Sequence, residues 1–141
     1  MQNSTLTLQR LSDMTQDNVE FDGQGVSQTL VAGQSAQNVD LVLADDCFVS
    51  GGQLIVKDAT FGDTFDLQVV DVSGLIAPAG TVIKQFVTNY AVSDDSQVKF
   101  NKDLPNVKKI PAGLALRVSY NSTGSVAPQV GINWDLYKAK Y

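Results

Sequence analysis

Residues 114–121 read LALRVSYN, and residues 130–137 read VGINWDLY. In both stretches a large apolar side chain occupies every second position, with small or polar residues between. This period of two is typical of a strand that buries one face, because successive side chains of a strand point to opposite sides. The turn-forming residues 121–124, NSTG, follow the first stretch. The sequence therefore predicts an antiparallel hairpin with one buried face.

Similar runs precede this pair at regular intervals, bounded by Gly, Asp and Pro. The expected strands are 26–31, 39–43, 48–57, 64–72, 81–92 and a short one at 97–100. Gly51-Gly52 predicts a bulge or bend. Apolar residues on both faces of 81–92 predict a strand that is partly covered on both sides. The fold class is therefore all-β, a two-sheet antiparallel sandwich, jelly-roll-like, with about eight to nine strands.

Residues 1–25 differ from the rest of the chain in composition. They are rich in Gln, Asn, Asp, Ser and Thr, and only Leu6, Leu8 and Leu11 suggest a short strand near 5–10. Residues 12–25 are expected to form a loop. We predict a polar N-terminal arm over 1–25 and one β-sandwich domain over 26–141. Such an arm gains order by packing on another surface, so the three leucines are candidate partner contacts. The equally weighted alternative is a polar leader with one edge strand.

Charge and hydropathy argue against two classes of partner. The 141 residues carry 10 basic and 15 acidic side chains, a net charge of −5. Affinity for nucleic acid needs a basic surface, so no nucleic-acid partner is expected. The apolar runs are too short to span a membrane, and none is predicted as a partner. The N-terminus lacks the basic flank and apolar stretch of a signal peptide, which predicts cytoplasmic synthesis.

The chain lacks the side chains on which most catalysis depends. It has no histidine, the commonest general base and metal ligand. Cys47 therefore has no His to activate it, and it is expected to be a buried strand cysteine. The chain contains three carboxylate pairs: Asp45-Asp46, Asp63 with Asp66, and Asp94-Asp95. Such pairs could bind Ca²⁺ or catalyse the hydrolysis of glycosides. We expect them instead at turns, where the Asp side chain accepts hydrogen bonds from the backbone. We predict no enzyme activity, no catalytic or metal-binding residue and no cofactor.

The aromatic residues near the end of the chain divide into two groups. Trp134 and Tyr120 fall on the apolar faces of their strands and are expected in the core. Tyr137 and Tyr141 lie off those faces and are candidate contact residues. Arg117 stands alone on the polar face of its strand and is expected to extend along the surface.

Several segments between residues 37 and 138 resemble a known group of proteins. These are QNVD (37–40), GGQLIVKD (51–58), FGD (61–63) with 65–71, AGTV (79–82), AGLALRV (112–118), YNSTG (120–124) and NWDLYK (133–138). The chain is similar in these segments to small structural proteins encoded among the virion genes of tailed bacteriophages.

This resemblance implies a non-enzymatic virion component that is present in many copies. It would sit on the capsid surface as a decoration or head accessory protein, or in the tail. Its partners would be other virion proteins and further copies of itself, and its location the virion, after synthesis in the host cytoplasm. The alternative is a receptor- or carbohydrate-binding module at a fibre tip, with a host surface glycan as ligand.

Overall fold

The computed structural model describes residues 19–92, 97–101 and 109–139. This part of the chain contains ten strands and no helix. The strands are β1 (Val19–Phe21), β2 (Gln24–Thr29), β3 (Gln37–Val42), β4 (Cys47–Lys57), β5 (Asp63–Asp71), β6 (Thr81–Val92), β7 (Gln97–Asn101), β8 (Lys109–Ile110), β9 (Ala115–Asn121) and β10 (Gln129–Ala139).

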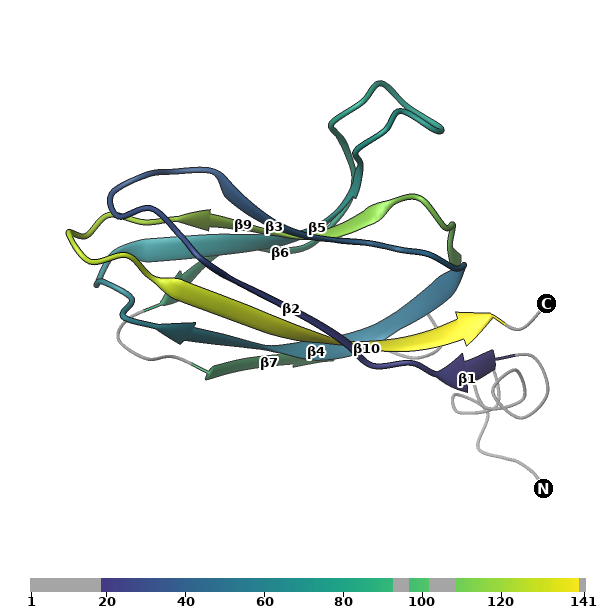
Figure 1. Cartoon of the computed structure of the whole chain (residues 1–141), viewed down its shortest axis with the longest axis horizontal. Helices are drawn as coiled ribbons and strands as arrows, with labels where there is room; N and C mark the ends of the chain where they lie inside the picture. Colours follow the sequence, from purple (N-terminus) through teal and green to yellow (C-terminus); the bar gives the residue numbers. More distant parts are fainter. Residues whose placement is uncertain (1–18, 93–96, 102–108, 140–141) are drawn as a thin grey trace.

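Two antiparallel sheets face each other (Figure 1). Sheet A has the order β1-β10-β4-β7, with β2 also on β10 and β8 also on β4, and sheet B has the order β3-β9-β5-β6. The pairs are nested along the chain: β5 with β6, β4 with β7, β3 with β9 and β2 with β10. An antiparallel ribbon rolled across two sheets in this way is a jelly roll. The predicted fold class is therefore confirmed, with β1 and β8 as short additions to an eight-strand roll.

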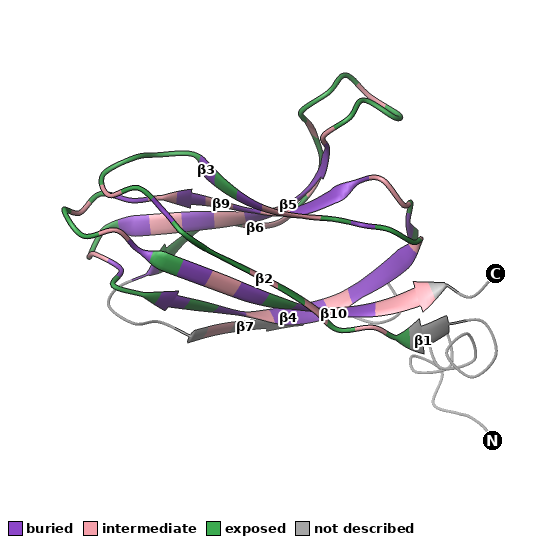
Figure 2. Cartoon of the chain, in the orientation of Figure 1, coloured by how far each residue is buried: buried purple, intermediate pink, exposed green. Residues whose placement is uncertain are grey.

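The core lies between the sheets, where the inward faces of both meet (Figure 2). The largest fully buried side chains are Trp134, Tyr120 and Phe65, so the prediction of core positions for Trp134 and Tyr120 is confirmed. On β4, Leu54 and Val56 are buried. A bulge interrupts the pairing of β4 with β10: Asp135 pairs with Gly51 and Leu136 with Val49, which confirms the expected irregularity beside the two glycines.

The predicted hairpin between the last two long strands is wrong. β9 pairs with β3 and β5 in sheet B, whereas β10 pairs with β1, β2 and β4 in sheet A. The alternating pattern requires only that each strand bury one face. In a sandwich, strands of opposite sheets satisfy that requirement equally well, and residues 122–128 cross from one sheet to the other.

The surroundings of two other strands also differ from expectation. Among the described strands, β6 is an edge strand that pairs only with β5, and its exposed residues include Val82, Ile83 and Tyr90, so these strands do not cover it on both sides. Arg117 is not alone, because it lies opposite Asp40 of β3 and its guanidinium donates two hydrogen bonds to that carboxylate, at 2.8 and 2.9 Å. Only the strand register brings these two residues together.

The sandwich begins before residue 26. Val19–Phe21 and the first residues of β2 pair with β10, so the expected loop over 12–25 is wrong for these positions. Residues 1–18, with most of the predicted arm and its three leucines, lie outside the described residues. The expected short strand at 97–100 is confirmed as β7.

Candidate interaction surface

Strand β5 begins and ends with a buried aspartate. Asp63 and Asp71 each have a relative exposure of 0%. A carboxylate removed from water must be satisfied by hydrogen bonds. Each of the two accepts several, and each organises the loop beside it.

Asp71 folds the loop that follows β5, residues 72–80, here called the finger loop. Its Oδ1 accepts the backbone N–H groups of Gly74 and Leu75 at 2.9 and 2.8 Å. Its Oδ2 accepts those of Ile76 and Ala77 at 2.7 and 2.9 Å. The Ile76 N–H contributes most to lowering the pKa of Asp71, and the other three bonds add to this against the opposing effect of burial.

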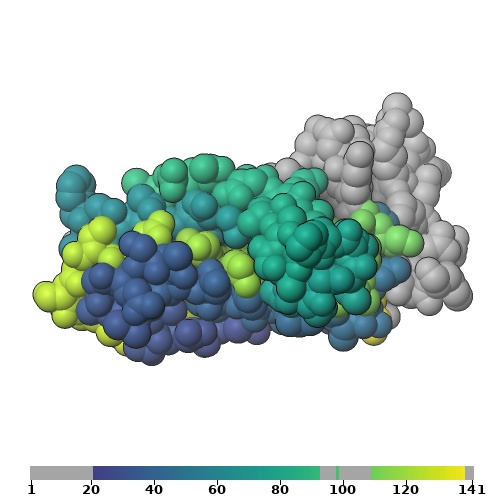
Figure 3. Space-filling model, turned by 90° about the horizontal axis from the view of Figure 1, so that it is seen from above, coloured from purple at the N-terminus to yellow at the C-terminus, as the bar shows by residue number. Residues whose placement is uncertain are grey.

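The finger loop projects from the sandwich (Figures 1 and 3). Its base is closed by the Gly80 N–H, which donates to the Asp71 carbonyl oxygen at 2.7 Å. Leu75 and Ile76 are 58% and 64% exposed. Gly113, with φ of 94°, lies against Leu75, and a Cβ there would overlap the Leu75 side chain. A loop fixed by four hydrogen bonds thus holds apolar side chains in water.

An apolar groove of about 220 Å³ lies beside the finger loop, and we call it the finger groove. Val69, Leu114 and Ile110 are its buried lining residues, and Ile76 and Ile83 are the exposed ones. The remaining lining residues are Lys84, Lys109 and Pro111. The groove therefore combines an apolar surface with two ammonium groups.

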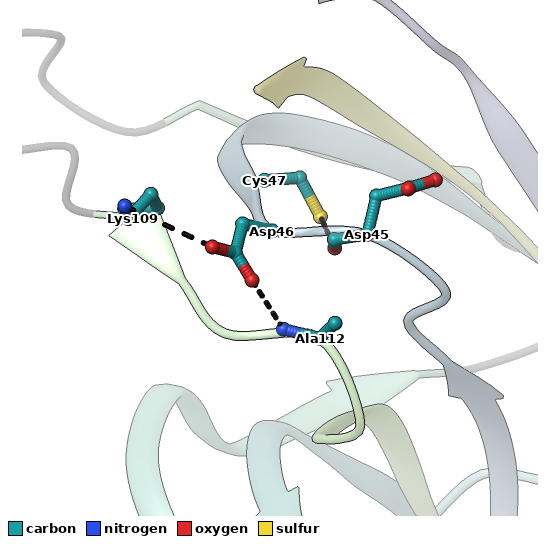
Figure 4. A network of polar contacts seen from close by, with 5 residues as sticks. All are labelled: Asp45, Asp46, Cys47, Lys109 and Ala112. Carbon is teal, nitrogen blue, oxygen red and sulfur yellow. Dashed lines mark hydrogen bonds and ion pairs between the residues drawn. The ribbon is translucent and has the colours of Figure 1, made fainter. Parts of the chain in front are cut away.

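A polar network supports the Lys109 side of the groove (Figure 4). One oxygen of Asp46 lies 3.8 Å from the Lys109 Nζ, and the other accepts the Ala112 N–H at 2.8 Å. The neighbouring Cys47 thiol donates to the Asp45 carbonyl oxygen at 3.4 Å. Burial raises the pKa of Cys47 to about 11, and nearby carboxylates add to the rise. Cys47 is buried in a strand as predicted, and its thiol is held in the unreactive protonated form.

At the other end of β5, Asp63 fixes a turn of residues 58–62, here called the Phe61 turn. Its Oδ2 accepts the Thr60 N–H at 3.1 Å and the Tyr120 hydroxyl at 2.7 Å. Its Oδ1 accepts both the N–H and the hydroxyl of Thr123 at 2.8 Å. Burial raises the pKa of Asp63, but the bonds from Tyr120, Thr60 and Thr123 outweigh this and lower it overall.

The Phe61 turn exposes the most accessible large apolar side chain among the described residues. Phe61 is 88% exposed, and Gly62 beside it has φ of 102°, a conformation that favours glycine. Val126, on the 122–128 crossover, is 55% exposed. Each end of β5 therefore carries apolar side chains on a loop built around a buried carboxylate.

The predicted contact residues lie elsewhere or outside the described part of the chain. Leu6, Leu8, Leu11 and Tyr141 fall outside it. Tyr137 is half-buried and packs against Phe21, with ring centroids 5.5 Å apart and ring planes at 74°. The two rings are nearly perpendicular and do not form one flat surface.

Sequence reasoning missed the side chains that form the exposed surface: Phe61, Leu75 and Ile76. One signal was available, because two large aliphatic residues stand inside the loop sequence SGLIAPAG at 73–80. Loops bounded by Gly and Pro are usually polar, so an apolar pair there points to a contact surface.

Of the predicted carboxylate pairs, Asp94-Asp95 lies outside the described residues, and the other two can be compared with the structure. Asp66 lies within β5 rather than at a turn, and its Oδ1 accepts the Asn89 N–H at 2.6 Å, so the turn expectation is wrong for Asp66. Asp63 points inward and Asp66 does not. In the residues that the structure describes, no group of three or more His, Cys, Asp or Glu is placed to hold a metal ion. The same residues include no helix that is long and apolar enough to cross a membrane.

A second hollow, of about 480 Å³, crosses the outer face of sheet A over β2, β10 and β4. Its lining is mostly uncharged and polar, with Lys57 as the titratable group: Ser27, Gln28, Thr29, Ile55, Lys57, Gln129, Val130 and Gly131. This hollow offers no acid–base pair for catalysis.

Fold and site together define a jelly-roll β-sandwich with hydrogen-bonded, apolar-tipped loops at both ends of one strand. No protein-family model matches this chain, and no curated protein matches it. Among solved structures it is similar to VP2 of infectious bursal disease virus in a subviral particle, with a TM-score of 0.46 and 13% identity over 87% of this chain. A structure of the Gt strain of the same virus has a TM-score of 0.40 and 13% identity over 86% of this chain.

The chain spans about a third of the length of these viral proteins, 34% and 36%. Both TM-scores are below 0.5, and the likeness therefore carries no functional conclusion.

Proposed function

We propose that this chain is a non-enzymatic structural protein of a phage virion, located on the capsid surface or in the tail, that assembles through protein–protein contacts. The finger loop is the observation that carries the assembly part of this proposal. The virion part draws support from the resemblance to proteins encoded among tailed-phage virion genes.

The finger loop has the properties of a docking element. Ile76 and Leu75 are more than half exposed, although burying one such side chain is worth about 1.5–3 kcal/mol. The four bonds to Asp71 fix the loop before any partner arrives. A preformed contact loses less conformational entropy on association, which favours binding.

The non-enzymatic part of the proposal rests on the chemistry of the described side chains. The buried carboxylates Asp63 and Asp71 are saturated with hydrogen bonds and have lowered pKa values, so neither is available as a general acid near neutral pH. The Cys47 thiol has a raised pKa. The structure offers no matched acid and base in one cleft among these groups.

The proposal is tested by rebinding the purified chain to virus particles made without its gene. We expect the wild-type chain to bind in many copies, counted on gels of particles separated from free protein. A Leu75→Ser/Ile76→Ser variant should bind at least about 10-fold less, because two central apolar contacts are lost.

The matched control is Val126→Ser, which changes a similarly exposed apolar residue at the opposite end. Its binding should stay near wild type, and both variants should melt within a few degrees of it. The virion proposal fails if particles made with the gene intact contain no copies of the chain. A finger variant that binds as well as wild type removes the finger loop from the contact.

A further inference from the structure

We propose that the finger groove of one copy binds the Phe61 turn of a second copy, so that copies associate head to tail. This inference deepens the proposed assembly role and rests on it, because it names one of the partners and the surfaces that meet.

The groove and the turn complement each other in shape and polarity. The groove has a volume of about 220 Å³. An enclosed apolar cavity of about 150 Å³ holds a benzene ring, so the groove has room for a phenyl side chain. Phe61 is 88% exposed and stands on a turn that Asp63 holds in place. An aromatic side chain that enters an apolar pocket is the usual centre of a protein interface.

The charges around the two surfaces are also complementary. The groove is lined by Lys84 and Lys109, although the whole chain carries a net charge of −5. The Phe61 turn carries the exposed Asp58, three residues before the ring. Lys109 is already 3.8 Å from Asp46, and both side chains of this pair are about half exposed. The acidic group beside the ring would approach this exposed pair and Lys84 as the ring enters the groove.

Geometry makes this a contact between copies. The turn precedes β5 and the finger loop follows it, and the nine residues of β5 separate their positions by about 26 Å. Phe61 therefore cannot reach the groove of its own copy. Two different surfaces meet in each contact, so the interface is heterologous and generates rings or filaments rather than isolated two-fold dimers.

The test is sedimentation velocity of the full chain over a concentration series, with one variant on each surface. Phe61→Ala removes the ring but leaves the groove intact. Ile83→Arg fills the groove and adds positive charge, and it alters a 41% exposed side chain, so the fold should persist. We expect the wild type to form species larger than dimers, and each variant to associate at least about 30-fold more weakly.

Mixing the two variants gives the decisive result. The Ile83→Arg copy still has its ring and the Phe61→Ala copy still has its groove, so the mixture should form a 1:1 dimer that does not grow. Val126→Ala, at the same end as Phe61, should associate like the wild type. Circular dichroism and melting curves confirm that each variant is folded.

Several outcomes would overturn the inference. The inference is wrong if the wild-type chain stays monomeric at the highest concentration. It is also wrong if the mixture of the two variants forms no dimer. Association that survives Phe61→Ala but is lost when residues 1–18 are deleted assigns the groove to the N-terminal segment instead. In each case the proposed function is still decided separately, because the presence of the chain in particles made with the gene intact does not depend on Phe61 or on the finger groove.

Discussion

The two ends of β5 share one feature, a buried aspartate that organises the neighbouring loop, but the hydrogen bonds of the two aspartates come from different parts of the chain. Each end has a fully buried aspartate that accepts four hydrogen bonds. Asp71 takes all of its bonds from backbone N–H groups three to six residues further along the chain. Asp63 takes three of its bonds from residues 57 to 60 positions away, on β9 and the crossover after it.

This difference in sequence separation has an energetic consequence. The Asp71 bonds order one projecting loop, which can lose its order while the sandwich remains folded. The Asp63 bonds join the start of β5 to the crossover between the sheets, so their loss affects the whole domain. Asp63 therefore supports the stability of the whole domain as well as the Phe61 turn, whereas Asp71 supports the finger loop alone.

The largest expected effect comes from removing the Asp63 carboxylate. Asp63→Ala leaves the Tyr120 hydroxyl and the Thr123 N–H without their acceptor, and hydrogen bonds to a charged group are worth about 1.5–3 kcal/mol each. We expect the free energy of unfolding to fall by at least about 3 kcal/mol, measured by urea denaturation.

Asp66→Ala on the same strand is the control, because the Asp66 carboxylate accepts its hydrogen bond from the N–H of an exposed residue, Asn89. A fall of less than about 1 kcal/mol for Asp63→Ala would contradict the comparison between the two ends.

Acid should weaken the protein through both aspartates. Each has a lowered pKa in the folded chain, so each adds stability that is fully present above its unfolded pKa of about 3.9. That stability is lost as the pH falls below about 4 and through the lower folded-state pKa. We expect the melting temperature to fall steeply in this range, and the slope to be smaller in Asp63→Asn. An equal slope in Asp63→Asn would show that other groups dominate acid unfolding.

A smaller effect on stability is expected from a change at Asp71, at the end of β5. Asp71→Asn replaces one of the two acceptor oxygens with a donor, so two of the four backbone bonds are lost. Hydrogen exchange at residues 74–77 should become at least about 10-fold faster, while the core strands keep their protection. Binding of the variant to particles should also fall, because the finger loop is less ordered. If the core amides lose protection equally, the finger loop and the sandwich unfold as one unit.

The smallest effect concerns the rate at which the Cys47 thiol, close to the finger groove, is labelled. With its pKa raised to about 11, Cys47 should be less than about 1% thiolate at pH 8, and a disulfide reagent should label it far more slowly than a free thiol peptide. The rate should rise to that of the peptide in urea. Fast labelling of the folded chain would show that this end opens readily.

The sequence predicted much of the fold but little of the site, and particular residues show why. Alternation placed Tyr120 and Trp134 in the core, because a strand that buries one face has an apolar residue at every second position. The pairing of β9 with β10 was predicted wrongly, because the pattern does not name the partner strand. The contact of Arg117 with Asp40 was not predicted either, because it depends on the register in which β9 pairs with β3.

By itself the sequence determined an all-β sandwich, because strand period, turn residues and the absence of helical period all act locally. Only the tertiary structure decided the roles of Asp63 and Asp71. Both occur in the sequence as ordinary turn-forming aspartates, and their burial depends on Tyr120 and Thr123 or on the path of the finger loop. The exposure of Phe61, Leu75 and Ile76 was decided in the same way, because it is a property of loops held away from the core.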